Sequence, residues 1–173
     1  MRRFRLDQRG VSAVEFALLA PVMIAFYFGV AEFCQVYIAQ KRIAHTASIV
    51  ADMIAQTDRM STGEIDDIFG VGQIVIKPYS GTTLKMRVSS VTRDPNGVAK
   101  VDWSRGDNMA ARNAGDTITI PAGLIENGES VIVSESNYGY SSPVGFIIKS
   151  TLPLRSTFYL RPRRVDKVIC TDC

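Results

Sequence analysis

A long apolar run near the start of the chain restricts its possible folds more than any other feature. Between residues 11 and 31 the only charged side chain is Glu15. As a helix this run measures about 31 Å at ~1.5 Å per residue, which matches a hydrocarbon core of ~30 Å. The stretch FALLAPVMIAFYFGVA has no polar face, whereas a helix packed in a small domain normally keeps one. The sequence therefore predicts a transmembrane helix over residues 11–31 rather than a buried core helix.

The residues before this run predict its orientation. The segment 2–9 is basic, with Arg2, Arg3, Arg5 and Arg9 opposed only by Asp7. By the positive-inside rule the N-terminus stays in the cytoplasm and everything after about residue 32 is exported. We therefore expect a single-pass protein.

Exported N-termini of this kind fall into three classes. A secretory signal has an apolar region of about 7–15 residues before a small-x-small cleavage site; this run is longer and residues 29–31 match such a site poorly, although release after Ala31 stays open. A lipoprotein needs a small residue directly before its cysteine, and here Phe33 precedes Cys34. The third class is cleaved before the apolar run, on the cytoplasmic side.

The junction RGVSAVEFALL resembles the processing site of type IV prepilins. Gly10 would be the last leader residue, since glycine lets a backbone approach a protease closely, and cleavage would free an amine on Val11. Glu15 lies on the same helical face as that amine, in a turn where the helix dipole favours negative charge. We predict processing between Gly10 and Val11, and assembly contacts by Val11, Glu15 and Phe16 in which Glu15 neutralises the Val11 amine of a neighbouring subunit.

The wider N-terminal stretch resembles TadE-like proteins, the minor pseudopilins of the tight-adherence (Flp, type IVb) pilus system. The matching positions, within about residues 9–45, are Gly10, residues 14–18, Pro21, Glu32 and Phe33. The resemblance implies a bacterial inner-membrane protein with a periplasmic C-terminal domain, located in a pilus or at its base. It also implies three partners: a prepilin peptidase, other pilins or pseudopilins, and an inner-membrane assembly platform.

After the apolar run the pattern becomes amphipathic. Residues 32–57 are predicted to continue the same helix, with a possible kink near Pro21. Its apolar stripe recurs at three- and four-residue steps and comprises Phe33, Val36, Tyr37, Ala44, Ala47, Val50, Ala51 and Ile54. We expect this stripe to pack on the exported domain of the same chain in preference to neighbouring subunits.

The remaining residues, 58–173, are predicted to form an extracytoplasmic β-rich domain. A short helix begins at a capping box of Ser61 and Glu64 and ends at Gly70 and Gly72. A hairpin turn is predicted at residues 94–97, and strands are predicted within residues 73–79, 84–90, 99–104, 115–120, 129–140 and 156–164. The expected fold class is α+β, with leader 1–10, transmembrane helix 11–31, amphipathic helix 32–57 and a small antiparallel sheet packed on the helix.

The sequence contains no catalytic motif. Walker A, GxGxxG and G-x-S-x-G patterns are absent, and the single histidine, His45, lies on the polar side of the helix. The basic residues cluster at 2–9 and 155–167 without a continuous basic face, which disfavours nucleic-acid binding. The tripeptide Arg105-Gly106-Asp107 is expected in a polar loop. We predict that the protein is not an enzyme and needs no cofactor or metal.

Cys170 and Cys173 have C-x-x-C spacing at the end of the chain. Redox sites with this spacing normally begin a helix on a βαβ scaffold, and the exported side is oxidising, so a disulfide is expected. A local Cys170–Cys173 ring, a bridge to another protein, and pairing of either cysteine with Cys34 all stay open.

Together these features predict a minor pseudopilin with a structural role in pilus assembly. The alternative is a permanently anchored extracytoplasmic binding module whose N-terminal span is never cleaved. A product that retains residues 1–10 would favour the alternative.

Overall fold

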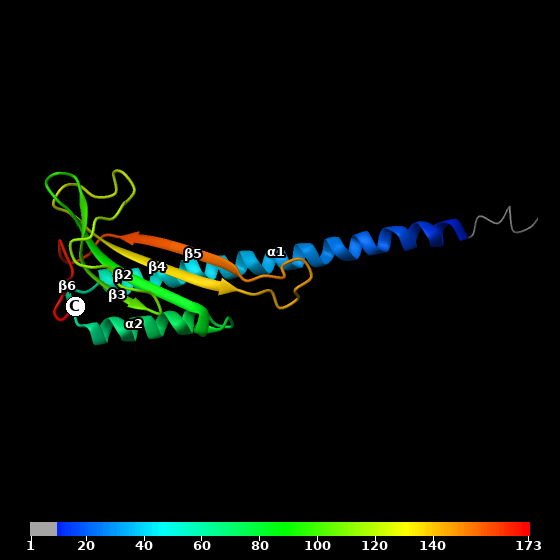
Figure 1. Ribbon diagram of the computed structural model, residues 1–173, viewed down its shortest axis with the longest axis horizontal. Coiled ribbons are helices and arrows are strands. Elements are labelled where there is room, and N and C mark those ends of the chain that lie inside the picture. Colours follow the sequence, from blue (N-terminus) through cyan, green and yellow to red (C-terminus); the bar gives the residue numbers. More distant parts are fainter. Residues whose placement is uncertain (1–9) are drawn as a thin grey trace, which may run out of the picture. The chain divides into compact units, whose positions relative to one another are not determined.

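The computed structural model describes residues 10–173, so the basic residues of the predicted leader, at 2–9, lie outside the described part. The fold is a mixed α+β arrangement, as predicted (Figure 1). In chain order its elements are α1 (Val11–Ala55), β1 (Arg59–Met60), α2 (Thr62–Val75), the 3-10 turn η2 (Gly81–Thr83), β2 (Leu84–Arg93), β3 (Ala99–Asp107), β4 (Ser130–Tyr140), β5 (Leu152–Leu160) and β6 (Ile169–Cys170).

The chain divides into two compact units. Unit 1 consists of the described residues up to Tyr37 together with Ser141–Thr151, the loop that joins β4 to β5. Unit 2 consists of Ile38–Tyr140 and Leu152–Cys173. The helix α1 contributes its first turns to unit 1 and its last turns to unit 2.

The helix α1 is a single element that continues through Pro21. Its last turns bury one stripe, made of Ala39, Ile43, Thr46, Ala47, Val50, Ala51, Ile54 and Ala55. The expectation that the stripe packs on the chain's own domain is therefore confirmed. Phe33 and Tyr37 do not belong to the buried stripe, because 70% and 55% of their surfaces are exposed. The sequence pattern placed the start of the stripe too early, since the core of unit 2 begins only after residue 37.

The sheet of unit 2 has the strand order β3-β2-β4-β5, and every neighbouring pair is antiparallel. The predicted turn at residues 94–97 joins β2 to β3. There the Asp94 carboxylate accepts hydrogen bonds from the backbone N–H groups of Asn96 and Val98, both at 2.9 Å. Gly97 adopts a φ of +81°, which the turn requires and glycine supplies without strain.

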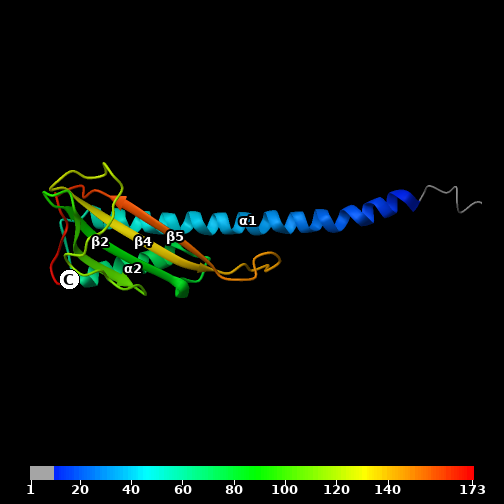
Figure 2. The ribbon, with the colours of Figure 1, turned by 45° about the horizontal axis from the view of Figure 1, so that its top comes forward.

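The sheet buries apolar side chains on both faces. On one face α2 lies against the sheet (Figure 2). There Gly72 of α2 approaches Met86 of β2 and Thr46 of α1. The second face carries a separate core cluster made of Val91, Ala99, Val101, Ile120, Ile125, Val131 and Val133. The first residues of β4 therefore alternate between two cores, with Val131 and Val133 in the second cluster and Ile132 buried on the other face. Strand β5 contains no buried residue.

The helix α2 begins at the predicted capping box of Ser61 and Glu64, but it does not end at Gly70 and Gly72. It continues to Val75, so the strand predicted within residues 73–79 is wrong. Gly72 is buried, and a Cβ there would lie 2.7 Å from the Met86 sulfur. This glycine allows close helix–sheet packing and does not terminate the helix.

Two other segments differ from the prediction. Residues 115–120 form only an isolated bridge, Lys100 with Thr117, and their apolar side chains cover the second core instead of joining the sheet. Arg105-Gly106-Asp107 ends strand β3 instead of lying in a loop. Arg105 there binds both carboxylate oxygens of Asp66 on α2, at 3.0 and 2.7 Å.

We predict that Gly106→Ala destabilises unit 2. A Cβ at this position would lie 1.9 Å from the Met109 carbonyl oxygen, so the backbone must shift. Overpacking of this kind costs about 2–3 kcal/mol in the free energy of unfolding, measurable by denaturant titration of the full chain in detergent with Trp103 fluorescence as the probe.

The matched control is Gly63→Ala in α2, where a Cβ meets nothing within 4 Å. This change should leave stability equal or raise it by up to ~1 kcal/mol, because alanine favours the helix. Equal stability of the two variants would contradict the structural role assigned to Gly106.

Candidate functional site

The predicted processing site lies at the very start of α1. Gly10 is the residue before the helix, which begins at Val11. A Cβ on Gly10 would meet nothing within 4 Å, and Gly10 is not among the glycines with a positive φ. The folded chain therefore does not require glycine at this position. A requirement for glycine would have to come from a step other than folding, such as proteolytic processing.

The predicted assembly residues lie together on the first turns of α1. Val11 and Phe16 are 52% and 72% exposed, and Glu15 is exposed between them. All three side chains are therefore accessible to a neighbouring molecule. Their roles in assembly stay predictions.

The apolar half of α1 is not a core helix. It is long and apolar enough to cross a membrane, and none of its most apolar window is buried within the chain. Large side chains are exposed all round it, including Val14, Leu18, Leu19, Val22, Met23, Phe26, Tyr27 and Phe33. An apolar surface of this size is stable only when lipid or another protein covers it.

At the end of this apolar segment a buried carboxylate, Glu32, binds the β4–β5 loop within unit 1. Glu32 is only 1% exposed, and both of its oxygens accept hydrogen bonds from the β4–β5 loop. Oε1 accepts from the Ser142 hydroxyl at 2.9 Å and from the Phe146 N–H at 2.7 Å. Oε2 accepts from the N–H groups of Ile147 and Ile148, at 2.9 and 3.0 Å. Because all four groups donate, the site fits the ionised form of Glu32.

The loop that Glu32 binds is drawn in orange in Figure 1. Its two ends are joined by the hydroxyls of Ser141 and Thr151, 3.2 Å apart. Glu32 belongs to the family resemblance, but the sequence predicts no role for it, because no local spacing connects residue 32 with residues 142–148. The sequence signal for this site is a carboxylate directly after the membrane-length apolar run.

Comparison with known proteins agrees with the resemblance seen in the sequence. Residues 10–52 match the family model described as TadE-like protein. The N-terminal helix is therefore similar to that family. The match begins at Gly10 and includes Glu15, Glu32 and nearly all of α1. No curated protein and no solved structure matches the chain significantly.

The TadE-like match supports involvement in the Tad pilus system. Together with the one candidate membrane helix found within residues 10–173, it fits a membrane-anchored protein. The matched segment ends within the last turns of α1, so it includes neither the sheet nor the β4–β5 loop.

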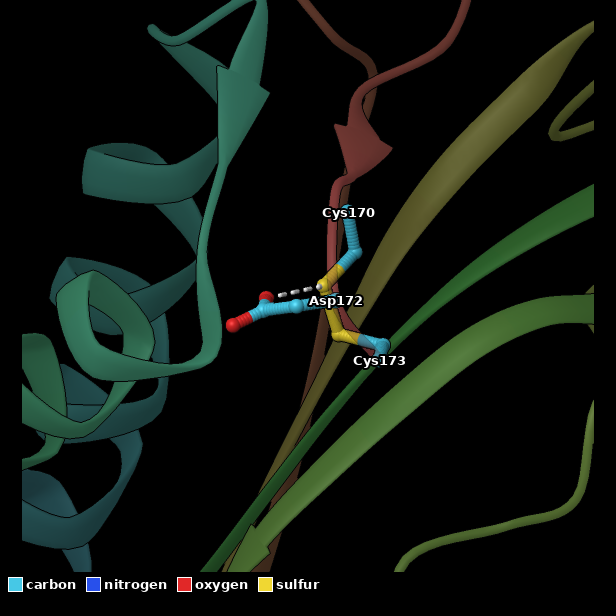
Figure 3. Close-up of side chains that lie close together, drawn as sticks. All are labelled: Cys170, Asp172 and Cys173. Carbon is cyan, nitrogen blue, oxygen red and sulfur yellow. Dashed lines mark hydrogen bonds between the residues drawn. A yellow bond between two sulfur atoms is a disulfide. The ribbon is translucent and has the colours of Figure 1, made fainter.

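The C-terminal cysteines form a local disulfide between Cys170 and Cys173 (Figure 3). Cys34 is free and exposed. Asp172 lies beside the disulfide, with Oδ1 3.7 Å from the Cys170 sulfur. Because a disulfide sulfur carries no proton, this approach is a contact and not a donated hydrogen bond. In the disulfide neither sulfur is a thiolate, so Cys170 and Cys173 offer no thiolate ligand to a metal.

Asp172 instead fastens the C-terminal segment to α2. Its two oxygens accept from the Thr62 N–H at 2.7 Å and from the Thr62 hydroxyl at 2.8 Å. The adjacent strand β6 pairs in parallel with β1, a two-residue pairing that the sequence analysis did not predict. Trp103 adds a third attachment, because its ring N–H donates to the Val168 carbonyl at 2.8 Å.

The main polar cluster of the sheet consists of Glu135, Arg87 and Arg112. Arg87 Nε lies 2.7 Å from Glu135 Oε2, while Arg112 binds both Glu135 oxygens at 2.6 and 2.9 Å. Burial raises the pKa of Glu135, but the hydrogen bonds from the two guanidinium groups outweigh it and hold the pKa below its ordinary value. Both arginines bind Glu135, and Arg112 thereby connects the loop after β3 to β4.

The carboxylates at the start of α2 are also engaged. Glu64 completes the capping box by accepting from the Ser61 N–H at 2.7 Å. The hydrogen bond from Arg105 lowers the pKa of Asp66. Of the three acidic residues in this segment, Glu64, Asp66 and Asp67, the first two therefore have protein partners and need no bound cation.

We predict that the contribution of Glu135 to stability depends on pH. Its pKa is lower in the folded chain than the ~4.3 of an unfolded chain. The resulting stability is therefore complete above about pH 5 and is lost as the pH falls through the lowered folded pKa. The difference in melting temperature between wild type and Glu135→Gln should be largest near pH 7 and shrink below about pH 4.

Glu126→Gln is the matched control for this measurement, because Glu126 is exposed in the loop before β4. It should change the melting temperature little at neutral pH. A Glu135→Gln difference that stays constant from pH 7 to pH 3.5 would contradict the proposed charge pairing.

Proposed function

We propose that this chain is a minor pseudopilin that acts structurally in assembly of an adhesive Tad (Flp) pilus. It inserts with its N-terminus in the cytoplasm and unit 2 in the periplasm, and a prepilin peptidase cleaves it after Gly10. The observation that carries the proposal is the start of α1. A helix whose most apolar window is not buried within the chain begins directly after a glycine that the fold does not need, and the TadE-like match begins at that glycine.

The exposed helix has a physical role in such an assembly. In lipid there is no hydrophobic driving force between apolar helices, so their association depends on close packing and on polar contacts. Glu15 supplies an exposed carboxylate near the helix start. An amine on Val11 of a neighbouring subunit, available only after cleavage, would pair with it at low dielectric. Processing would then switch on assembly by creating this partner.

The proposed role is not catalytic and involves no cofactor or nucleic acid. The polar groups that gather in the described part of unit 2 bind one another, as Glu135 does with Arg87 and Arg112, and Asp66 with Arg105. The proposed partners are the prepilin peptidase, other pilins or pseudopilins, and an inner-membrane assembly platform. The sheet of unit 2 would make the specific protein contacts.

We predict that Gly10→Val blocks processing without affecting insertion. The space around Gly10 is open, so a valine side chain fits the folded chain, but it hinders close approach of the backbone to the peptidase. Intact mass spectrometry of membrane-extracted protein should give a wild-type chain that begins at Val11 and a variant that retains residues 1–10.

Gly63→Ala serves as the control, because its surroundings are equally open and it lies outside the cleavage site; it should be processed like wild type. A wild-type chain that retains residues 1–10 in the presence of the peptidase would refute the pseudopilin proposal in favour of a permanently anchored binding module. A product that begins at Glu32 would instead indicate secretion.

We predict that Glu15→Ala leaves insertion and processing intact but reduces pilus assembly about tenfold, equivalent to ~1.4 kcal/mol. The expected cause is loss of the carboxylate that pairs with the Val11 amine. The measurement is the amount of pilus recovered by shearing, normalised to the membrane level of the processed chain. Ser12→Ala in the same turn is the control, and normal piliation of the Glu15→Ala strain would remove the assembly role.

A further inference from the structure

We propose that the tip of the β4–β5 loop, residues 144–148, inserts into the interfacial region of the lipid bilayer beside the membrane span, and that Glu32 positions it there. The inference rests on the membrane span of the proposed function. It does not depend on cleavage at Gly10 or on pilus assembly.

The first step is that Glu32 fixes the backbone of the loop tip. Three consecutive N–H groups, those of Phe146, Ile147 and Ile148, point at one carboxylate and form a concave anion-binding site. Gly145 makes the turn before them with a φ of +62°, and its N–H donates to the Ser142 hydroxyl at 3.2 Å. The backbone of the tip is thus held by hydrogen bonds to Glu32 and Ser142.

Although Glu32 binds the backbone of the tip, the apolar side chains of the tip remain about half exposed. Val144, Phe146 and Ile147 are 50%, 51% and 60% exposed. The Phe146 ring centre lies 5.6 Å from that of Phe28, and the Ile147 Cδ1 atom lies 3.0 Å from where a Cβ on Gly29 would be. The tip therefore lies beside the last turn of the predicted span and continues its apolar surface.

The polar groups of the tip also fit the edge of a bilayer. Irregular backbone is costly next to hydrocarbon because its N–H groups lose their water partners. Here Glu32 binds three of these groups, so the tip can approach lipid without that cost. Lys149, which follows the tip, is exposed. Its long side chain can reach phosphate groups while the neighbouring residues stay in the apolar layer.

These observations favour lipid over a protein partner. The side chains of residues 144, 146, 147 and 148 are all aliphatic or aromatic, so they offer no polar pattern for specific recognition. They lie next to a helix surface that is itself expected to contact lipid. In the proposed topology the contacted surface is the periplasmic leaflet.

The experiment measures the depth of single nitroxide labels in vesicles of phosphatidylethanolamine and phosphatidylglycerol. The full-length chain carries Cys34→Ser, because Cys34 is the free cysteine and Cys170 and Cys173 are joined. Labels are placed by Val144→Cys in the tip, Phe26→Cys in the span and Ala122→Cys on an exposed loop of unit 2. Collision rates with oxygen, which concentrates in lipid, are compared with those of a water-soluble nickel chelate.

We predict that the label at 144 collides preferentially with oxygen, as the label at 26 does, while the label at 122 collides preferentially with the nickel chelate. Glu32→Gln should change the ratio of oxygen to nickel collision rates at 144 to the ratio found at 122. The reason is that a neutral amide has one acceptor oxygen and cannot bind all the donors. Glu15→Gln, the same change earlier in α1, should leave the value at 144 unchanged. Buried Trp103 reports by its fluorescence whether unit 2 stays folded in each variant.

Three outcomes would overturn the proposal. A label at 144 that is as accessible to nickel as the label at 122, while the label at 26 lies in lipid, refutes tip insertion and leaves the pseudopilin proposal intact. Protection of 144 from both reagents indicates a second copy or another protein on the tip. If Glu32→Gln unfolds unit 2, Phe146→Ser with Ile147→Ser replaces it, and an unchanged depth at 144 in that variant contradicts the role of the apolar side chains.

Discussion

The exposed apolar surface of the first half of α1 is the constraint on which the rest of the structure depends. A helix with Val14, Phe16, Leu18 and Phe26 open on different sides cannot be stable in water at this length. Burying such side chains stabilises by about 1.5–3 kcal/mol each. The environment of this segment must therefore come from outside the described chain, and a bilayer supplies it on all sides at once.

The same helix meets a different environment after residue 37. Ala39, Ala47 and Ala51 are fully buried in unit 2, and buried Ser134 and Ser136 contribute further small side chains from β4. Gly72 likewise brings α2 close to Met86. Small residues let the backbones of neighbouring elements approach closely in unit 2. The first half of α1 instead carries large exposed side chains. One continuous helix thus combines a segment suited to lipid with a segment suited to a protein core.

The sequence predicted those features that have a local physical cause. The apolar run, the capping box at Ser61 and the turn after Asp94 each depend on residues a few positions apart, and the structure contains all three. The errors arose where a distant contact overrides a local preference. Gly72 has the appearance of a helix end, yet Met86 explains it; residues 115–120 alternate like a strand, yet they cover a core. The pairing of β1 with β6 and the contact of Glu32 with residues 142–148 join parts more than 100 positions apart, and no single-sequence pattern encodes them.

The two carboxylates of α1 illustrate how environment separates their functions. Glu32 is buried, and donors of its own chain occupy both oxygens, so it acts within the molecule. Glu15 is exposed on the first turns and remains accessible to a partner from another molecule. The TadE-like match spans both positions. A charge placed near each end of an apolar helix is costly unless it meets a donor, and here the donors differ: a loop of the same chain at one end, and at the other an amine that cleavage after Gly10 would create on a neighbour.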